Sequence, residues 1–280
     1  ASSFACVNSL QVLTNPYPAA TELTDSFYKV TMQSQVKPDL DNKIRSVIEK
    51  ISNNAIEMSS AQGYYSYWPA KKNMLLRSDS TGETVSITIQ EYPKYFYLDN
   101  LHHFWEKQWN EDMAEDMYIK EKKPISAVPS GKGYYYTLRD TGSSKSIERL
   151  VILDDHFKYS LYGVSDTLTG LTGLTKTIFD SFKPLSSSGQ NDIYHDNMHL
   201  FFDDLFSTDS TTHKKALNAL TSVHFKFKDV PLMMKAITEV NPTVKDYFEI
   251  KTGLISELGF VNDTITDKIP LFLKTIYAQT

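Results

Sequence analysis

The chain has 280 residues, of which 41% are hydrophobic and 12% aromatic, and its formal net charge is −5. This length predicts two domains, or one domain with a helical extension. The acidic balance argues against sequence-independent nucleic-acid binding, which needs clustered lysine and arginine. No apolar run approaches the ~18 residues that cross a bilayer, so no membrane span is expected. The single cysteine, Cys6, excludes an intramolecular disulfide and a cysteine-based zinc site.

The amino-terminal segment, residues 1–62, is predicted to contain a proline-punctuated loop and two helices. The first helix is expected in residues 23–36. The second is expected in residues 38–58, where apolar residues recur near one helical face and Asp39 can cap the first turn. The polar residues that follow mark a domain boundary.

Residues 63–184 are predicted to form one domain, in which residues 63–164 have the alternation and the aromatic content that are typical of β-strands. A hairpin is expected around the turn at residues 78–83, because Val85, Ile87 and Ile89 alternate with polar residues after it. The segment is therefore predicted to fold around an antiparallel sheet.

Two helices are expected within this segment. The first covers residues 98–113, where aromatic residues recur at helical spacing. Three strands follow over residues 132–164. A closing helix is then expected over residues 166–183, with Asp166 as its cap and Pro184 as its stop.

The layout of this segment resembles the PsbP/Mog1-like fold over about residues 63–183. The likeness rests on YYSYWPAKK, the hairpin through VSITIQEY, the helix at LHHFWEKQW, the strands GYYYTL, RLVIL and KYSLYG, and the final IFDSFKP. The resemblance implies an antiparallel sheet sandwiched by helices. It also implies a role in binding or assembly, because known members of this fold are mostly not enzymes.

Residues 190–280 change to the helical period and predict four or five short helices in series. Asp229 and Asn241 each stand just before a proline-containing helix start. Short helices in series without strands predict a HEAT-like α-solenoid stack. Its predicted shared core comprises Phe201, Leu217, Leu220, Met233, Ile237, Phe248 and Leu254. The expected fold class is α+β: a central antiparallel sheet flanked by helices, with a carboxyl-terminal all-α stack.

The stretch YHDNMHLFFDD, residues 194–204, is the clearest candidate for chemistry. His195, His199 and Asp203 follow one another at intervals of four, which would place two imidazoles and a carboxylate along one helix. A zinc ion could use these histidines only with a further ligand from elsewhere. Asp196 also stands where a zinc protease has glutamate. We therefore expect a solvated helix flank, with no metal and no other cofactor.

Aromatic strand residues are the candidates for binding. Alternate strand residues face opposite sides of a sheet, so at least one of three consecutive tyrosines at residues 134–136 must face away from the core. Exposed tyrosine and tryptophan are typical of binding surfaces, so Tyr65, Trp68 and Tyr135 are the predicted binding residues. Helices that cover both faces of the sheet would instead bury these rings.

Two further motifs favour structure over chemistry. GLTGLTKT at residues 170–177 lacks the glycine that a phosphate-binding loop needs before its lysine, and its leucines indicate the interior of a helix. LDDHF at residues 153–157 is typical of a hairpin turn, where aspartate side chains accept nearby backbone N–H groups.

These features favour a non-enzymatic binding or scaffold module of a larger exported bacterial protein, in the periplasm or cell envelope. The start at Ala1 and the amphipathic end at Thr280 predict a piece of a longer polypeptide. The partner, a protein or a small molecule, is left open. The alternative is an accessory part of a hydrolase that acts through His195 and His199. An enzyme should show a concave pocket with convergent titratable groups, and a scaffold should show a broad groove or an exposed aromatic patch.

Overall fold

The computed structural model is of the α+β class and contains a six-stranded antiparallel sheet. It describes residues 17–38, 70–92, 94–98, 100–113, 116–125, 132–185, 193–221, 223, 225–244, 246–261 and 268–278. The chain divides into two compact units. The first, called the sheet unit, comprises Ala1–Ser46, Ala70–Tyr92 and His102–Asp192. The second, called the helical unit, comprises Val47–Pro69, Pro93–Leu101 and Ile193–Thr280.

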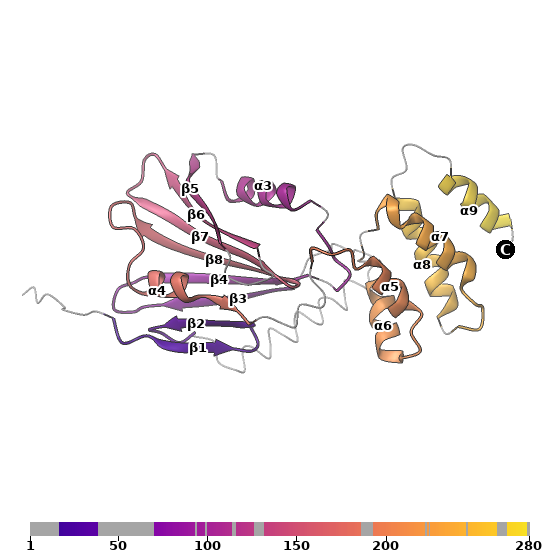
Figure 1. The fold of residues 1–280 in the computed structure, drawn as a ribbon, viewed down its shortest axis with the longest axis horizontal. Helices are drawn as coiled ribbons and strands as arrows, with labels where there is room; N and C mark the ends of the chain where they lie inside the picture. Colours follow the sequence, from indigo (N-terminus) through magenta and orange to yellow (C-terminus); the bar gives the residue numbers. More distant parts are fainter. Residues whose placement is uncertain are drawn as a thin grey trace, which may run out of the picture. The chain divides into compact units, whose positions relative to one another are not determined.

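The six-stranded sheet has the order β3-β4-β8-β7-β6-β5, and every neighbouring pair is antiparallel (Figure 1). Its strands are β3 Ala70–Arg77, β4 Thr84–Glu91, β5 Met117–Ile125, β6 Lys132–Asp140, β7 Lys145–Asp154 and β8 Phe157–Asp166. The predicted hairpin is present, because β3 and β4 pair through Met74 and Ile87, both fully buried. The predicted turn after residue 153 is also present, and Asp155 adopts φ 54° there.

One face of the sheet is covered by α4, Gly173–Ser181, and by a small second sheet (Figure 1). That sheet has the order β1-β2-β9, with strands Thr21–Asp25, Val30–Ser34 and Lys183–Pro184. The core on this face joins these elements to the large sheet. Its members include Tyr28, Val30, Met32, Ile87, Leu161, Leu174 and Ile178.

The prediction of a helix over residues 23–36 was wrong. Asp25 accepts backbone N–H bonds from Phe27 and Tyr28 at 3.0 and 3.2 Å, and this turn sends the chain back as β2. Val30 and Met32 are buried on one side, which is a period of two rather than 3.6. The second predicted helix, residues 38–58, lies almost entirely outside the described residues.

The closing helix begins later than predicted. Asp166 ends β8, and its carboxylate accepts the N–H of Leu168 at 2.9 Å instead of capping a helix. Gly170 and Gly173 both have positive φ, at 68° and 49°, so the chain turns before α4 starts. Leu168 is 94% exposed in this turn.

The opposite face of the sheet carries α3, Leu101–Asp112, as predicted (Figure 1). The ring of Tyr134 lies 4.8 Å from that of Trp105, and the hydroxyl of Tyr136 donates to Asp112. Tyr135 points to the other face, where its ring lies 6.4 Å from that of Phe179. Helices therefore cover both faces of the sheet where these three tyrosines lie.

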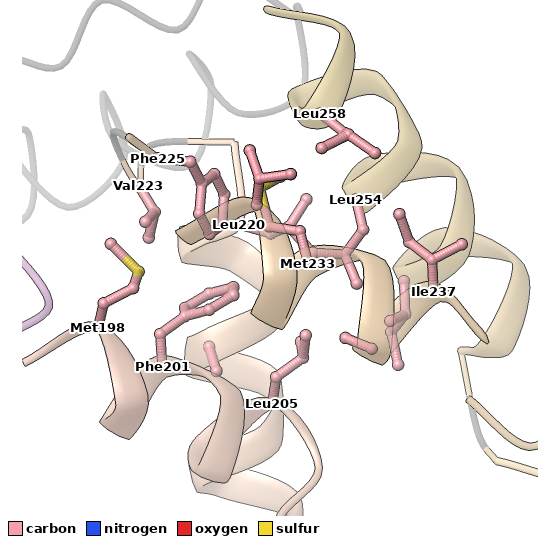
Figure 2. Packing of buried hydrophobic residues seen from close by; sticks show 14 of the residues in the cluster. Met198, Phe201, Leu205, Leu220, Val223, Phe225, Met233, Ile237, Leu254 and Leu258 are labelled. Atoms are coloured by element: carbon pink, nitrogen blue, oxygen red, sulfur yellow. The ribbon is translucent and has the colours of Figure 1, made fainter. Parts of the chain in front are cut away.

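The helical unit contains five α-helices among its described residues: α5 Met198–Leu205, α6 Ser210–Ala219, α7 Val230–Glu239, α8 Tyr247–Phe260 and α9 Lys268–Ala278. A 3-10 turn, η1 Phe227–Asp229, precedes α7. The helices share one apolar core, and Figure 2 shows side chains of α5, α7 and α8 converging in it. Each helix is short, so its stability depends on this packing.

The predicted core of this unit is largely confirmed. Phe201, Leu220, Met233, Ile237 and Leu254 are buried, and Leu217 packs against them. Phe248 was predicted wrongly, because it is 79% exposed. The buried stripe of α8 runs through Ile250, Leu254 and Leu258, which leaves Phe248 on another side of the helix.

Residues 94–98 lie between β4 and α3 in the sequence but pack with the helices. Tyr95 and Tyr97 belong to the helical core, and the N–H of Leu98 donates to the carbonyl of Ile193 at 2.7 Å. The hydroxyl of Tyr95 also donates to Asp204 of α5 at 2.8 Å. No sequence pattern indicated this excursion.

Among the described residues, none of the helices has the length and apolar character that a bilayer crossing requires.

Candidate binding site

A groove of about 550 Å³ lies between α5 and α7 of the helical unit. We call it the α5–α7 groove. Its lining residues are His199, Phe202, Asp203, Phe206, Leu232, Lys235, Ala236, Glu239, Val240, Asn241 and Val244. Six of these are apolar, and five are polar or charged. The size and the mixture are those of ligand sites in proteins, where a few polar groups accompany an apolar lining.

The α5 wall is one stripe of that helix. Residues 199, 202, 203 and 206 follow the spacing i, i+3, i+4 and i+7, which places them on one side of a helix. A neighbouring stripe of α5, through Met198, Phe201 and Leu205, faces the core instead. The helix therefore holds the groove residues on a rigid support.

The α7 wall repeats this arrangement. Residues 232, 235, 236, 239 and 240 follow the same helical spacing, and Asn241 and Val244 continue the lining beyond the end of the helix. Phe206 and Leu232 are 40% and 41% exposed, so each wall presents an accessible apolar side chain.

The two walls run in roughly the same direction. Just before the helices, Asp196 pairs with Lys228. At the other end, His213 contacts the carbonyl of Leu205 at 2.7 Å and the carboxylate of Asp246 at 3.3 Å. The segments just before α5 and α7 are thereby joined by one ion pair, and His213 of α6 links the last residue of α5 to Asp246, which follows α7.

On each wall of the groove, a basic side chain is followed by a carboxylate one helical turn later. Asp203 comes one helical turn after His199 on α5, and Glu239 comes one turn after Lys235 on α7. Lys235 lies 3.9 Å from Glu239, and both side chains are well exposed. Asp203 forms no ion pair or side-chain hydrogen bond with any other described residue. Both carboxylates therefore belong to the carboxyl-terminal half of the groove.

The sequence predicted that His195, His199 and Asp203 lie along one helix, but His195 is not part of α5. Asp196 accepts the N–H of Met198 at 3.0 Å, so α5 begins at Met198 and His195 lies in the preceding turn. His199 and Asp203 do line the same groove, but their side chains are not paired. Within the described part of the chain, no three histidine, cysteine, aspartate or glutamate side chains are grouped to hold a metal ion.

Of the three predicted aromatic binding residues, Tyr135 alone is described, and it is not among the lining residues of the groove. Tyr65 and Trp68 lie outside the described residues. Tyr135 is partly buried, and its hydroxyl donates to the carboxylate of Glu148. Burial is the main cause that raises the pKa of Tyr135, and this hydrogen bond raises it further. Its role in ligand binding stays a prediction.

The carboxylate of Glu148 forms a buried polar cluster that the sequence did not indicate. The side chain is 3% exposed and accepts hydroxyl bonds from Tyr135, Thr137 and Ser165. A buried carboxylate needs such partners, because leaving it unsatisfied is costly. The available signal was weak: Glu148 shares its strand face with buried Leu150.

On the other sheet face, Asp112 holds a second cluster. Its carboxylate accepts from Gln108 at 2.9 Å and from the guanidinium of Arg149 at 3.0 Å. Lys158 donates to Gln108 at 2.7 Å, and burial lowers the pKa of Lys158. These contacts hold α3 on the sheet.

No protein-family model matches the chain, and no curated protein sequence matches it.

Proposed function

We propose that this chain is a non-enzymatic binding module and that the α5–α7 groove is its binding site. The observation that carries the proposal is the groove itself, whose two helical walls each present an exposed apolar residue, Phe206 and Leu232. Exposed apolar groups that line a concavity, with charged groups beside them, are typical of ligand and partner sites.

The test uses a fluorescent apolar probe, anilinonaphthalene sulfonate, and the full chain. Leu232→Asp and Phe206→Asp each place a charge on one wall of the groove. Phe248→Asp is the matched control, because Phe248 is 79% exposed in the same unit and does not line the groove. We expect the two groove variants to lower probe affinity about tenfold, a cost of ~1.4 kcal/mol, and the control to leave it unchanged. Equal binding by all four proteins would refute the proposal.

The second candidate function is that of an accessory part of a hydrolase. The observation that favours it is that His199 and Asp203 line a pocket together with Lys235 and Glu239. General acid–base work would need these groups within hydrogen-bond reach of one another or of a substrate. Hydrolysis of a chromogenic ester, phosphate or peptide that disappears in His199→Ala would favour this function over the binding module.

We further propose that the sheet unit adopts a PsbP/Mog1-like fold. The support is six antiparallel strands with α3 on one face and α4 on the other. For the helical unit we propose a HEAT-like α-solenoid, supported by short consecutive helices that share one core. A place in the periplasm or cell envelope, as part of a larger exported bacterial protein, completes the proposal, and fractionation of cells that express the parent gene would test it.

A further inference from the structure

We infer that the occupant of the α5–α7 groove is an amphipathic helix of a partner protein, with a basic side chain at the end of its apolar stripe. This inference rests on the proposed function, because it names the partner class for the same groove. Three features of the walls support this inference: their helical backbone, their length and their charges.

The walls favour a helix over an extended peptide. An extended peptide binds by adding its backbone hydrogen bonds to an exposed strand edge. None of the described residues of the helical unit forms a β-strand, and both walls are helices whose N–H and C=O groups are mostly used internally. A bound segment must therefore satisfy its own backbone, and an α-helix does so.

The length of the walls sets the size of the contact. The eight residues of α5 span about 12 Å at 1.5 Å per residue. This is a little more than two helical turns, so an apolar stripe at positions i, i+3 or i+4, and i+7 would fill the groove. The lining residues of each wall have this same spacing.

The charges of the groove favour a positively charged side chain on the partner. The groove carries two carboxylates, Asp203 and Glu239, against one ammonium, Lys235. Lys235 and Glu239 face each other, whereas Asp203 lacks a cationic partner among the described residues. Each carboxylate also stands toward the carboxyl end of its own helix, where the helix dipole adds partial negative charge. A lysine or arginine at this end of the docked helix would meet two carboxylates and the negative ends of two helix dipoles, against one ammonium, Lys235.

The experiment uses labelled peptides of about 16 residues, because shorter isolated helices are marginal in water. One peptide carries an apolar two-turn stripe and a lysine beside its end, and the other carries glutamine at the lysine position. Binding to the full chain is followed by fluorescence polarisation. The protein variants are Leu232→Asp, the pair Asp203→Asn with Glu239→Gln, and the control Glu249→Gln. Glu249 is an exposed carboxylate of α8 that does not line the groove.

We expect the lysine peptide to bind about two- to fivefold more tightly than the glutamine peptide, as one exposed ion pair allows. The ratio should fall to about one in the Asp203→Asn, Glu239→Gln protein and persist in the control. If both peptides bind equally well and Leu232→Asp weakens both, the basic partner is wrong and the binding module stands. If neither peptide binds while the apolar probe still depends on Leu232, the helical partner is wrong. If neither the peptides nor the probe responds to Leu232→Asp, the proposed function itself fails.

Discussion

Leu220 and Gly253 form the contact at which the packing of the helical unit can be tested most directly. Leu220 is the C-cap of α6 and is 2% exposed in the shared core (Figure 2). Gly253 lies inside α8, and a Cβ at this position would come within 2.5 Å of Leu220 Cδ2. Glycine in a helix interior costs ~0.5–1 kcal/mol relative to alanine. The close approach of Leu220 gives a reason for glycine here.

The single and double substitutions should not be additive. Leu220→Ala leaves a cavity and should destabilise the helical unit by ~2–5 kcal/mol. Gly253→Ala gains helix propensity but overpacks the contact, and overpacking costs ~1–3 kcal/mol, so we expect a net loss. In the double variant the new methyl group occupies space that Leu220 has vacated. The double variant should therefore be more stable than the sum predicts by about 1–3 kcal/mol, a normal coupling for residues in contact.

The assay must report on the helical unit alone. Trp105 and Trp109, two of the three tryptophans, lie in α3 of the sheet unit, so tryptophan fluorescence does not report on the helical unit alone. Hydrogen exchange of peptides from α6 and α8 measures the opening free energy of these helices. Gly259→Ala is the matched control, because among the described residues no atom outside its chain neighbours and its own helix backbone lies within 4 Å of a Cβ added there. It should stabilise α8 by ~0.5–1 kcal/mol. If Gly253→Ala stabilises as much as this control, or if the cycle is additive, the packing argument is refuted.

Two further predictions concern a buried carboxylate, Glu148, and a half-buried one, Glu257. Glu148→Gln should destabilise the sheet unit by ~1–3 kcal/mol, because the new amide N–H₂ would face hydroxyl groups that now donate to a carboxylate; unchanged exchange protection of β6–β8 would contradict this. Burial raises the pKa of Glu257 above its ordinary value of 4.5. The folded protein then binds this proton more readily than the unfolded chain, so stability rises as pH falls through the raised pKa toward 4.5. Glu257→Gln should remove that gain and stabilise the helical unit near neutral pH, and urea unfolding followed by circular dichroism at several pH values would reveal a failure of either effect.

The elements with strong local patterns were predictable. Val85, Ile87 and Ile89 alternate over one strand, and Phe104, Trp105 and Trp109 of α3 recur at helical spacing. The failures lie where the pattern is short or where a side chain competes for backbone groups. Asp25 and Asp166 were expected inside or at the start of helices, but each binds a nearby N–H group and turns the chain.

Only the α5 side of the candidate site could be predicted from the sequence. His199 and Asp203 were identified as neighbours on a helix, and they do line the groove. Their counterparts on α7, Lys235 and Glu239, are separated from them by a helix and two turns, and nothing local connects the pairs. The groove depends on the relative rotation of α5 and α7 around a shared core, which only tertiary packing determines.

The apolar arc of α5 was nevertheless an available signal. A helix that packs on one core needs one apolar stripe, and α5 has this stripe at Met198, Phe201 and Leu205. Phe202 and Phe206 each follow a core residue by one position, which rotates them by about 100° around the helix axis. They widen the apolar surface of α5: Phe202 packs against the edge of the core and also lines the groove, and Phe206 remains 40% exposed. Leu232, 41% exposed, adds a similar surplus on α7. Apolar residues in excess of the core on two neighbouring helices are what a second, intermolecular contact requires, and the groove lies where these two surpluses meet.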